Sequence, residues 1–229
     1  MYLRMIATVL TVLSLSGCQQ PSTGLSNIPL PPDARASLGS IEVIVSQFQL
    51  PIFASSMPAQ GTNLASGIAS GLNTGLLKER VELVNKALAT FDYADDSLKA
   101  TQQAFARVDT ARLRVSPTAL RSNKPMFEIL KASSADAVLL FNVHYTLSSD
   151  RALQFVGILA LIPKSEALRK FRPDPTARIE DDYVIFRTQK SLTLYFSGAD
   201  VPERVRSEFD KAASELAAWA ATEANALLK

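Results

Sequence analysis

The strongest constraint on the fold is a β-rich stretch in the second half of the chain, followed by one long helical segment. Residues 137–147 alternate between apolar and polar side chains over most of their length, and this period of two predicts a strand. Residues 153–162 are apolar at odd and even positions alike, which is typical of a strand covered on both faces. Residues 183–197 alternate again, as one long strand or as two strands joined near Gln189.

Helical periodicity fills most of the remaining chain. Apolar residues recur three or four positions apart in the segments 62–91, 97–108, 125–132 and 202–228. Ser97 is expected to cap the second of these helices. Residues 41–50 and 112–115 are short extended segments. This order of elements predicts an α+β domain in two layers. We expect a mostly antiparallel sheet of about four strands, helices packed mainly on one face, and a C-terminal amphipathic helix.

One local motif suggests a family for the folded part. In Ser134-Ala135-Asp136-Ala137-Val138-Leu139-Leu140 the end of a helix leads into a strand. With the next strand and the terminal helix, this segment resembles the periplasmic α/β domains of the TolB amino-terminal region and of the curli-secretion lipoprotein CsgG. The resemblance spans residues 41–229 and implies a periplasmic α/β domain. A secretion channel of the CsgG kind would need long membrane-facing hairpins, and the sequence does not show two clear ones.

The N-terminus carries an export signal that ends at the only cysteine of the chain. It has a positive start at Arg4, an apolar stretch over residues 5–15 and then small residues. The tetrapeptide Leu15-Ser16-Gly17-Cys18 resembles the lipobox of bacterial lipoproteins. The resemblance implies that residues 1–17 are a signal peptide, and that Cys18 is the lipidation site, with its new N-terminus acylated as well. The alternatives are a plain signal peptide or a membrane helix, but a spanning helix needs about 20 apolar residues.

The residues after Cys18 predict where the protein is located. In enteric bacteria an aspartate next to the lipidated cysteine retains a lipoprotein at the inner membrane, so Gln19 implies the periplasmic face of the outer membrane. Residues 18–40 are rich in proline and serine, and they predict the lipidated cysteine followed by a flexible tether. We expect residues 41–229 to form a single α+β periplasmic domain.

Composition excludes several classes of function. The 229 residues carry 24 basic and 22 acidic side chains, and loss of Arg4 with the signal peptide brings the charge closer to zero. A nucleic-acid-binding protein needs a clearly basic surface, so we predict no nucleic-acid partner. With Cys18 lipidated, no thiol remains for a disulfide, a nucleophile or a metal ligand.

The titratable residues give weak indications of chemistry. His144 is the only histidine, and it lies on the polar side of a predicted strand without a G-x-S-x-G motif anywhere in the chain. A zinc site needs three or four ligands. We therefore predict no catalytic residue, no metal and no cofactor.

Charged clusters admit more than one interpretation. Acids at junctions between elements cap helices or are solvated, although paired carboxylates also serve glycoside hydrolases and calcium sites. The two acidic clusters are Asp92, Asp95 and Asp96, and Glu180, Asp181 and Asp182. Basic clusters fit a solvated surface, lipid headgroups or an acidic partner. The first comprises Arg107, Arg112, Arg114, Arg121, Lys124 and Lys131, and the second Lys164, Arg169, Lys170, Arg172 and Arg178.

Three functions remain open at this point. The first is a non-enzymatic envelope lipoprotein that binds a partner protein as an accessory or assembly factor. The second is a binder of lipid or another apolar ligand, and the third is a hydrolase acting on peptidoglycan. The glycines Gly67, Gly71 and Gly75 favour close helix packing, with a mobile segment or a homo-oligomer contact as the alternative.

Overall fold

The computed structural model describes most of the predicted domain. The described residues are 27–47, 78–89, 91–108, 111–121, 128, 130–147, 152–173, 184–195 and 201–229. In chain order the elements are α1 (Pro32–Ala36), β1 (Ile41–Ser46), α3 (Tyr93–Phe105), β2 (Leu113–Val115), β3 (Ala137–Leu147), β4 (Ala152–Pro163), α5 (Glu166–Arg169), β5 (Phe186–Tyr195) and α6 (Pro202–Leu227). Residues 78–88 are also helical and lead into α3.

The sheet has five strands in the order β2-β1-β3-β4-β5. β1 pairs in parallel with β2 and β3, whereas the longer pairings of β3 with β4 and of β4 with β5 are antiparallel. The predicted α+β class is confirmed. The fifth strand arises because the extended segment around Arg114 joins the edge of β1. β4 lies inside the sheet and is buried along almost its whole length, as its continuous apolar run predicts.

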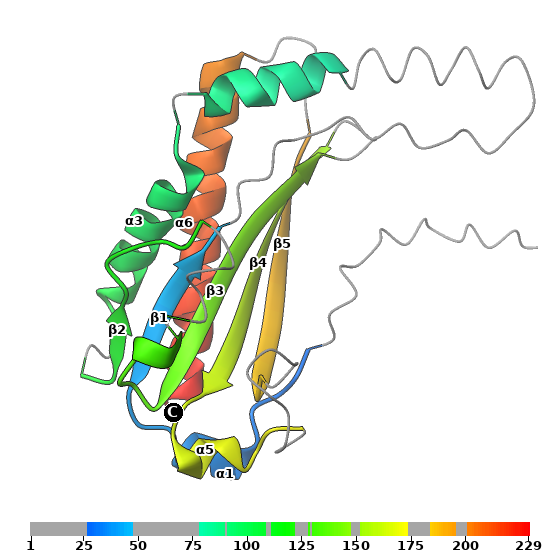
Figure 1. Ribbon diagram of the computed structural model, residues 1–229. Helices are drawn as coiled ribbons and strands as arrows, with labels where there is room; N and C mark the ends of the chain where they lie inside the picture. Colours follow the sequence, from blue (N-terminus) through cyan, green and yellow to red (C-terminus); the bar gives the residue numbers. More distant parts are fainter. Residues whose placement is uncertain are drawn as a thin grey trace, which may run out of the picture.

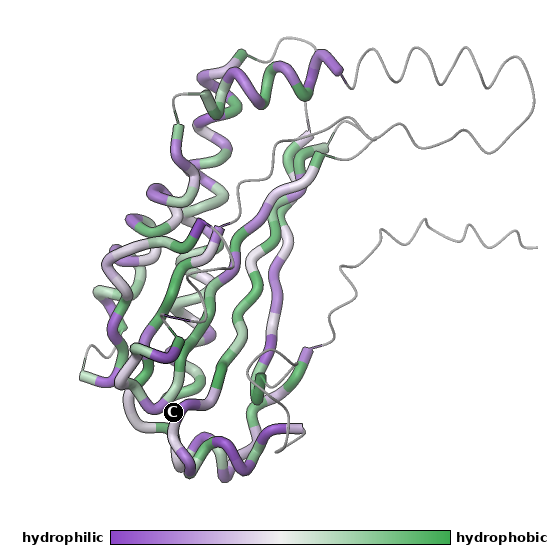
Figure 2. The backbone as a smooth tube through the Cα atoms, viewed as in Figure 1, coloured by the Kyte–Doolittle hydropathy of each residue, from purple (hydrophilic) through white to green (hydrophobic). Residues whose placement is uncertain are grey.

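Two long helices, α3 and α6, lie side by side on one face of the sheet (Figure 1). Residues in register across the strands point to the same face, so Val43, Leu139 and Leu161 all pack beneath these helices. Figure 2 shows β4 coloured mainly as hydrophobic, whereas the edge strand β5 is largely hydrophilic over its middle. The helices are thus packed mainly on one face, as the sequence predicts.

The opposite face of the sheet carries a smaller core. Ile44, Val138 and Ile162 point to this side, where they meet Leu120 and Leu130 from the segment that follows β2. This second core explains why the interior strands are apolar on both faces. It also holds the segment that precedes β3 against the sheet.

An aromatic cluster joins the helices to the sheet. The Phe209 ring on α6 makes edge-to-face contacts with Tyr93, Tyr145 and Phe155, at ring-centroid distances of 5.0, 4.9 and 4.8 Å. The Phe91 ring makes a further edge-to-face contact with Phe209, at a centroid distance of 6.0 Å. Burial raises the pKa of Tyr145 to about 12, so this phenol stays neutral at physiological pH.

The prediction of a flexible tether through residue 40 is wrong for residues 27–40. Ile28 and Arg187 of β5 exchange two backbone hydrogen bonds of 2.9 Å. Leu30, Ala34 and Leu38 are buried in the main core. These three residues are spaced four apart, so they lie on one side of the segment. A judgement from composition alone missed this, because the segment is rich in proline. Residues 19–26 lie outside the described part.

The first turn of α3 also differs from the prediction. We expected the helix to start at Ser97, but it starts at Tyr93, and Asp92 is the N-cap. The Asp92 carboxylate accepts hydrogen bonds from the N–H groups of Ala94 and Asp95, at 3.1 and 3.3 Å. A carboxylate suits the positive end of a helix, and the buried Tyr93 ring extends the core contacts of α3 by one turn.

Candidate functional site

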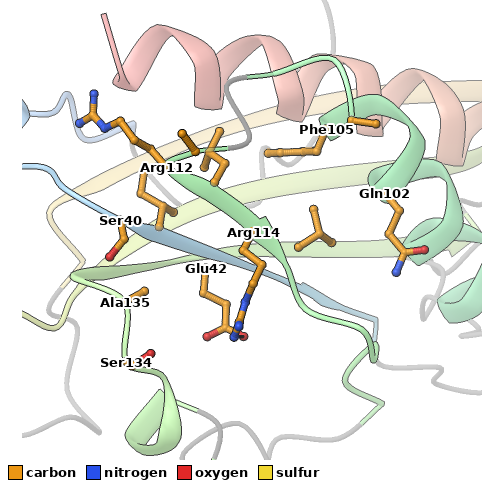
Figure 3. Close-up of a pocket in the computed structure, with 13 residues that line it drawn as sticks. Ser40, Glu42, Gln102, Phe105, Arg112, Arg114, Ser134 and Ala135 are labelled. Carbon is orange, nitrogen blue, oxygen red and sulfur yellow. Dashed lines mark hydrogen bonds and ion pairs between the residues drawn. The ribbon is translucent and has the colours of Figure 1, made fainter.

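A pocket of about 560 Å³ lies along β2, the short strand at one edge of the sheet. We call it the β2-edge pocket. Its walls come from the start of β1, from β2, from the second half of α3 and from the turn before β3 (Figure 3). Its polar lining residues are Ser40, Glu42, Gln102, Arg112, Arg114 and Ser134.

The outer edge of β2 is unpaired among the described residues. The Ile41 N–H donates to the Arg112 carbonyl at 2.7 Å, and the Ser116 N–H donates to the Val43 carbonyl at 2.8 Å. The backbone groups of even-numbered residues of β2 therefore face β1. Since successive residues of a strand face opposite edges, the N–H and C=O groups of Leu113 and Val115 point outward.

A buried carboxylate forms one wall of the pocket. Glu42 and Arg114 are direct partners in the β1–β2 register, and the Arg114 Nη2 atom lies 3.4 Å from Glu42 Oε1. The Ser133 hydroxyl donates to Glu42 Oε2 at 2.6 Å. These partners matter because Glu42 is only 8% exposed, and a buried carboxylate without partners is costly.

Arg114 is the most available charged group of the pocket. Its side chain is 76% exposed, and a guanidinium has five N–H donors. The contact with Glu42 occupies only one end of this group (Figure 3). The remaining donors can reach a carboxylate, a phosphate or a backbone carbonyl of a bound molecule.

Arg112, the second arginine of the pocket, has a structural role. Its guanidinium donates to the carbonyls of Gly39 at 3.3 Å and of Leu228 at 3.4 Å, and also to the carbonyl of Leu38. The positive charge lies beside the C-terminal end of α6, where unpaired carbonyls give the helix a negative end. Arg112 thus holds α6, β2 and the chain before β1 together.

The first basic cluster is therefore divided among several places. Arg121 contacts Asp92 at 2.6 Å and Asp95 at 2.7 Å, at the start of α3. Burial raises the pKa of Asp92, but the hydrogen bond and charge of Arg121, with the backbone N–H groups, outweigh it and lower the pKa overall. Asp92 of this acidic cluster caps α3, and of the basic cluster only Arg112 and Arg114 line the β2-edge pocket. Lys124 lies outside the described residues.

The described residues of the second basic cluster follow β4 and surround α5. The Lys164 ammonium donates to the carbonyls of Leu130 and Lys131, and partial burial and the nearby Arg169 lower its pKa. Lys170 stacks over the Phe171 ring at 4.9 Å, so it lies along the surface. Four further predictions fall outside the described part of the chain: Arg178, the cluster Glu180–Asp182, the glycines at 67, 71 and 75, and Cys18.

His144 is half-buried on the sheet face opposite α3 and α6. Burial lowers its pKa, which favours the neutral imidazole. Within the described residues, no group of three or more His, Cys, Asp or Glu side chains could hold a metal ion. No helix in the same part of the chain is long and apolar enough to cross a membrane.

The aspartate of the motif that suggested a family has a clear structural role. The Asp136 Oδ2 atom accepts hydrogen bonds from the Ser40 N–H at 2.8 Å and from the Ser40 hydroxyl at 2.9 Å. The Asp136 carbonyl accepts from the N–H groups of Lys164 and Ser165, both at 2.8 Å. Asp136 therefore ties together the starts of β1 and β3 and the end of β4.

Sequence reasoning placed Arg114 in a basic cluster but missed Glu42 and Ser133. The signal for Glu42 was present, because it is the one charged residue in the mostly apolar strand Ile41–Ser46. A single acid in such a strand needs a partner when the strand is buried. Ser133 gave no comparable signal, since it lies 91 positions after Glu42 in the chain and its hydroxyl reaches Glu42 only in the folded protein.

Comparisons with known proteins add little to this geometry. No protein-family model matches the chain, and no curated protein matches it. Among solved structures it is similar to two PelC dodecamers from Paraburkholderia phytofirmans, one of them a point variant. The variant is 13% identical with a TM-score of 0.29, and the match covers 83% of this chain and 96% of that chain. The other is 14% identical with the same TM-score, and the match covers 84% of this chain and 96% of that chain. Similarity at this level does not establish a shared fold, so function is inferred from the site alone.

Proposed function

We propose that this chain is a non-enzymatic lipoprotein of the bacterial envelope. It is anchored through Cys18 to the periplasmic face of the outer membrane, and its α+β domain binds a partner protein as an accessory or assembly factor. The observation that carries the binding role is the β2-edge pocket, where an open groove runs beside an unpaired strand edge. Exposed backbone edges of this kind are used for the recognition of extended segments.

The short connection between anchor and domain supports a site close to the membrane. Cys18 precedes Ile28 by ten residues, and Ile28 is already bonded to β5. At about 3.3–3.6 Å per residue, the intervening chain reaches at most roughly 35 Å. The domain of an anchored molecule therefore stays beside the bilayer.

The described structure offers less support for the two alternatives. An apolar-ligand binder needs an enclosed apolar cavity, whereas the β2-edge pocket is open and carries Glu42 and Arg114. A glycoside hydrolase needs two carboxyl groups about 5–9.5 Å apart. Glu42 is the only carboxylate that lines this pocket, and Ser133 and Arg114 already contact it.

Replacing the lipidated cysteine tests the anchor. In Cys18→Ser the lipid attachment is lost, so we expect the protein to leave the membrane pellet while keeping its fold, measured by fractionation and circular dichroism. Gln20→Ala is the matched control, because Gln20 lies two residues after the cysteine and its replacement leaves the lipobox intact. If Cys18→Ser still sediments with membranes after a high-salt wash, or if mass spectrometry finds a free thiol on the exported protein, the anchor is excluded.

The membrane assignment has its own test. Under the sorting rule of enteric bacteria, Gln19→Asp should move the protein from the outer-membrane to the inner-membrane fraction of a sucrose gradient. An unchanged distribution would contradict the assignment made from Gln19.

Site-specific crosslinking tests the binding role. A photoreactive residue at Arg114 lies in the pocket, whereas one at Lys211 is exposed on α6 away from it. We expect a discrete crosslinked partner from position 114 in intact envelopes and none of the same mass from position 211. Equal products from both positions, or none from position 114, would exclude the β2-edge pocket as the binding site.

A further inference from the structure

We propose that the β2-edge pocket binds an extended, acidic segment of its partner, which adds to the sheet as a strand beside β2. This inference rests on the proposed function and names the kind of partner that the pocket takes. It is carried by two independent observations: the outward backbone groups of β2 and the exposed guanidinium of Arg114 between them.

The backbone geometry selects an extended segment. Leu113 and Val115 present two N–H and two C=O groups outward, and the described residues supply no partner for them. Only another extended backbone satisfies donors and acceptors at this spacing. The neighbouring pocket then receives side chains from one side of the added strand, next to Phe105 and Gln102 of α3.

The charges select an acidic segment. Arg121 is neutralised by Asp92 and Asp95, but Arg112 contacts only backbone carbonyls. Arg114 contacts only the Glu42 carboxylate among the described residues, and its side chain is 76% exposed. The exposed guanidinium of Arg114 is therefore the positive group that a segment beside β2 meets. A carboxylate on the added strand opposite Arg114 meets its free donors.

The same geometry argues against a second copy of this chain as the partner. A two-fold antiparallel pairing centred on β2 would place Arg114 directly opposite Arg114 of the other copy. Like charges in direct cross-strand pairs are destabilising. The pocket therefore fits a different chain better than it fits itself.

A peptide titration tests the proposal. The probe is a capped heptapeptide of alternating glutamate and valine, added to the ¹⁵N-labelled mature-length chain carrying Cys18→Ser. We expect amide shifts to concentrate at Leu113, Arg114 and Val115, and to be at least ten-fold weaker at equal concentration for a peptide with lysine in place of glutamate. Equal effects of both peptides, shifts that concentrate elsewhere, or no shift at millimolar peptide would overturn the proposal.

Two pairs of variants separate the backbone and charge contributions. Arg114→Gln should weaken binding of the glutamate peptide about two- to five-fold, the range for a partly exposed ion pair, whereas Lys211→Gln should leave it unchanged. Val115→Pro removes one outward N–H but none of the bonds to β1, so it should weaken binding more than ten-fold. Val115→Thr keeps that N–H and should bind normally. If Val115→Pro does not fold, hydrogen exchange decides, because the bound peptide must slow exchange at Leu113 and Val115.

Crosslinking and peptide binding together distinguish a failure of strand addition from a failure of the proposed binding role. If position 114 crosslinks a partner in envelopes but the peptide does not bind along β2, the pocket binds its partner by other chemistry and strand addition is excluded. If crosslinking at position 114 also fails, the proposed function fails with it.

Discussion

Replacing Phe209 by alanine is the most direct test of how the two layers are held together. Phe209 is fully buried on α6, and its ring contacts aromatic residues from the start of α3 and from both β3 and β4. Loss of a buried phenylalanine side chain costs about 3–5 kcal/mol in free energy of unfolding. Because the cavity walls come from three different elements, they cannot close readily, and we expect about 4–5 kcal/mol.

Two further variants help to interpret this loss of stability. The first separates the contribution of the ring contacts from that of apolar volume, and the second removes a buried ring outside the aromatic cluster. Phe209→Leu keeps most of the apolar volume but loses the edge-to-face contacts, which are worth about 0.5–1.5 kcal/mol each beyond burial, so we expect a loss of about 2 kcal/mol. Phe105→Ala removes a ring that is 4% exposed and has no ring contact among the described residues, so about 3 kcal/mol is expected.

Urea unfolding followed by fluorescence of Trp219, the only tryptophan, measures these losses. For a domain of this size the Phe209→Ala loss corresponds to a fall in Tm of roughly 10–20 °C. A Phe209→Ala loss below about 2 kcal/mol, or one no larger than that of Phe105→Ala, would refute the idea that the aromatic cluster is the main junction between α6 and the sheet.

Two smaller predictions concern the ends of the strands and the start of α3. Gly39→Ala should lower the thermal unfolding temperature more than Ser37→Ala, because the new methyl group would overlap Asp136 Oδ2 and displace its hydrogen bonds to Ser40; equal effects would contradict this role. Arg121→Ala should cost less than about 1 kcal/mol at pH 7, since the ion pairs are partly exposed. The folded-state pKa of Asp92 is lowered, so its contribution is present above the unfolded value near 3.9 and is lost as pH falls through the folded pKa. The difference between Arg121→Ala and the wild type should therefore shrink in urea titrations below about pH 4, and a constant difference would count against the ion pair.

Local periodicity was sufficient to predict most of the strands and helices. The alternation in residues 137–147 and the continuous apolar run in 153–162 predicted β3 and β4, since a strand exposes its two faces at alternate residues. The helical stripe of α6 was equally clear, and Pro202 marks its first turn. These features depend only on residues within one helical turn or a few strand positions of each other, so they can be predicted from the sequence.

Element starts were harder to predict where several capping residues compete. Asp92 and Ser97 both fit the start of a helix by residue type. The choice between them depends on Tyr93, which is buried only because Phe209 and Phe155 come from distant parts of the chain. The burial of Leu30, Ala34 and Leu38 was missed for the same reason, because β5 and the main core that hold this segment are not visible in its own composition.

The sequence by itself determined the single cysteine, the α+β class and the nearly balanced charge, and it predicts an export signal, because each is a property of composition or of short-range pattern. Only the tertiary structure decided which arginines are neutralised, which strand edge stays open and where the pocket lies. Arg121 and Arg114 have the same chemistry, yet one bridges two aspartates and the other faces an open groove. That difference follows from contacts between residues far apart in the chain. Glu42 meets Arg114 only once β2 has paired with β1, and it meets Ser133 only once β3 has paired with β1.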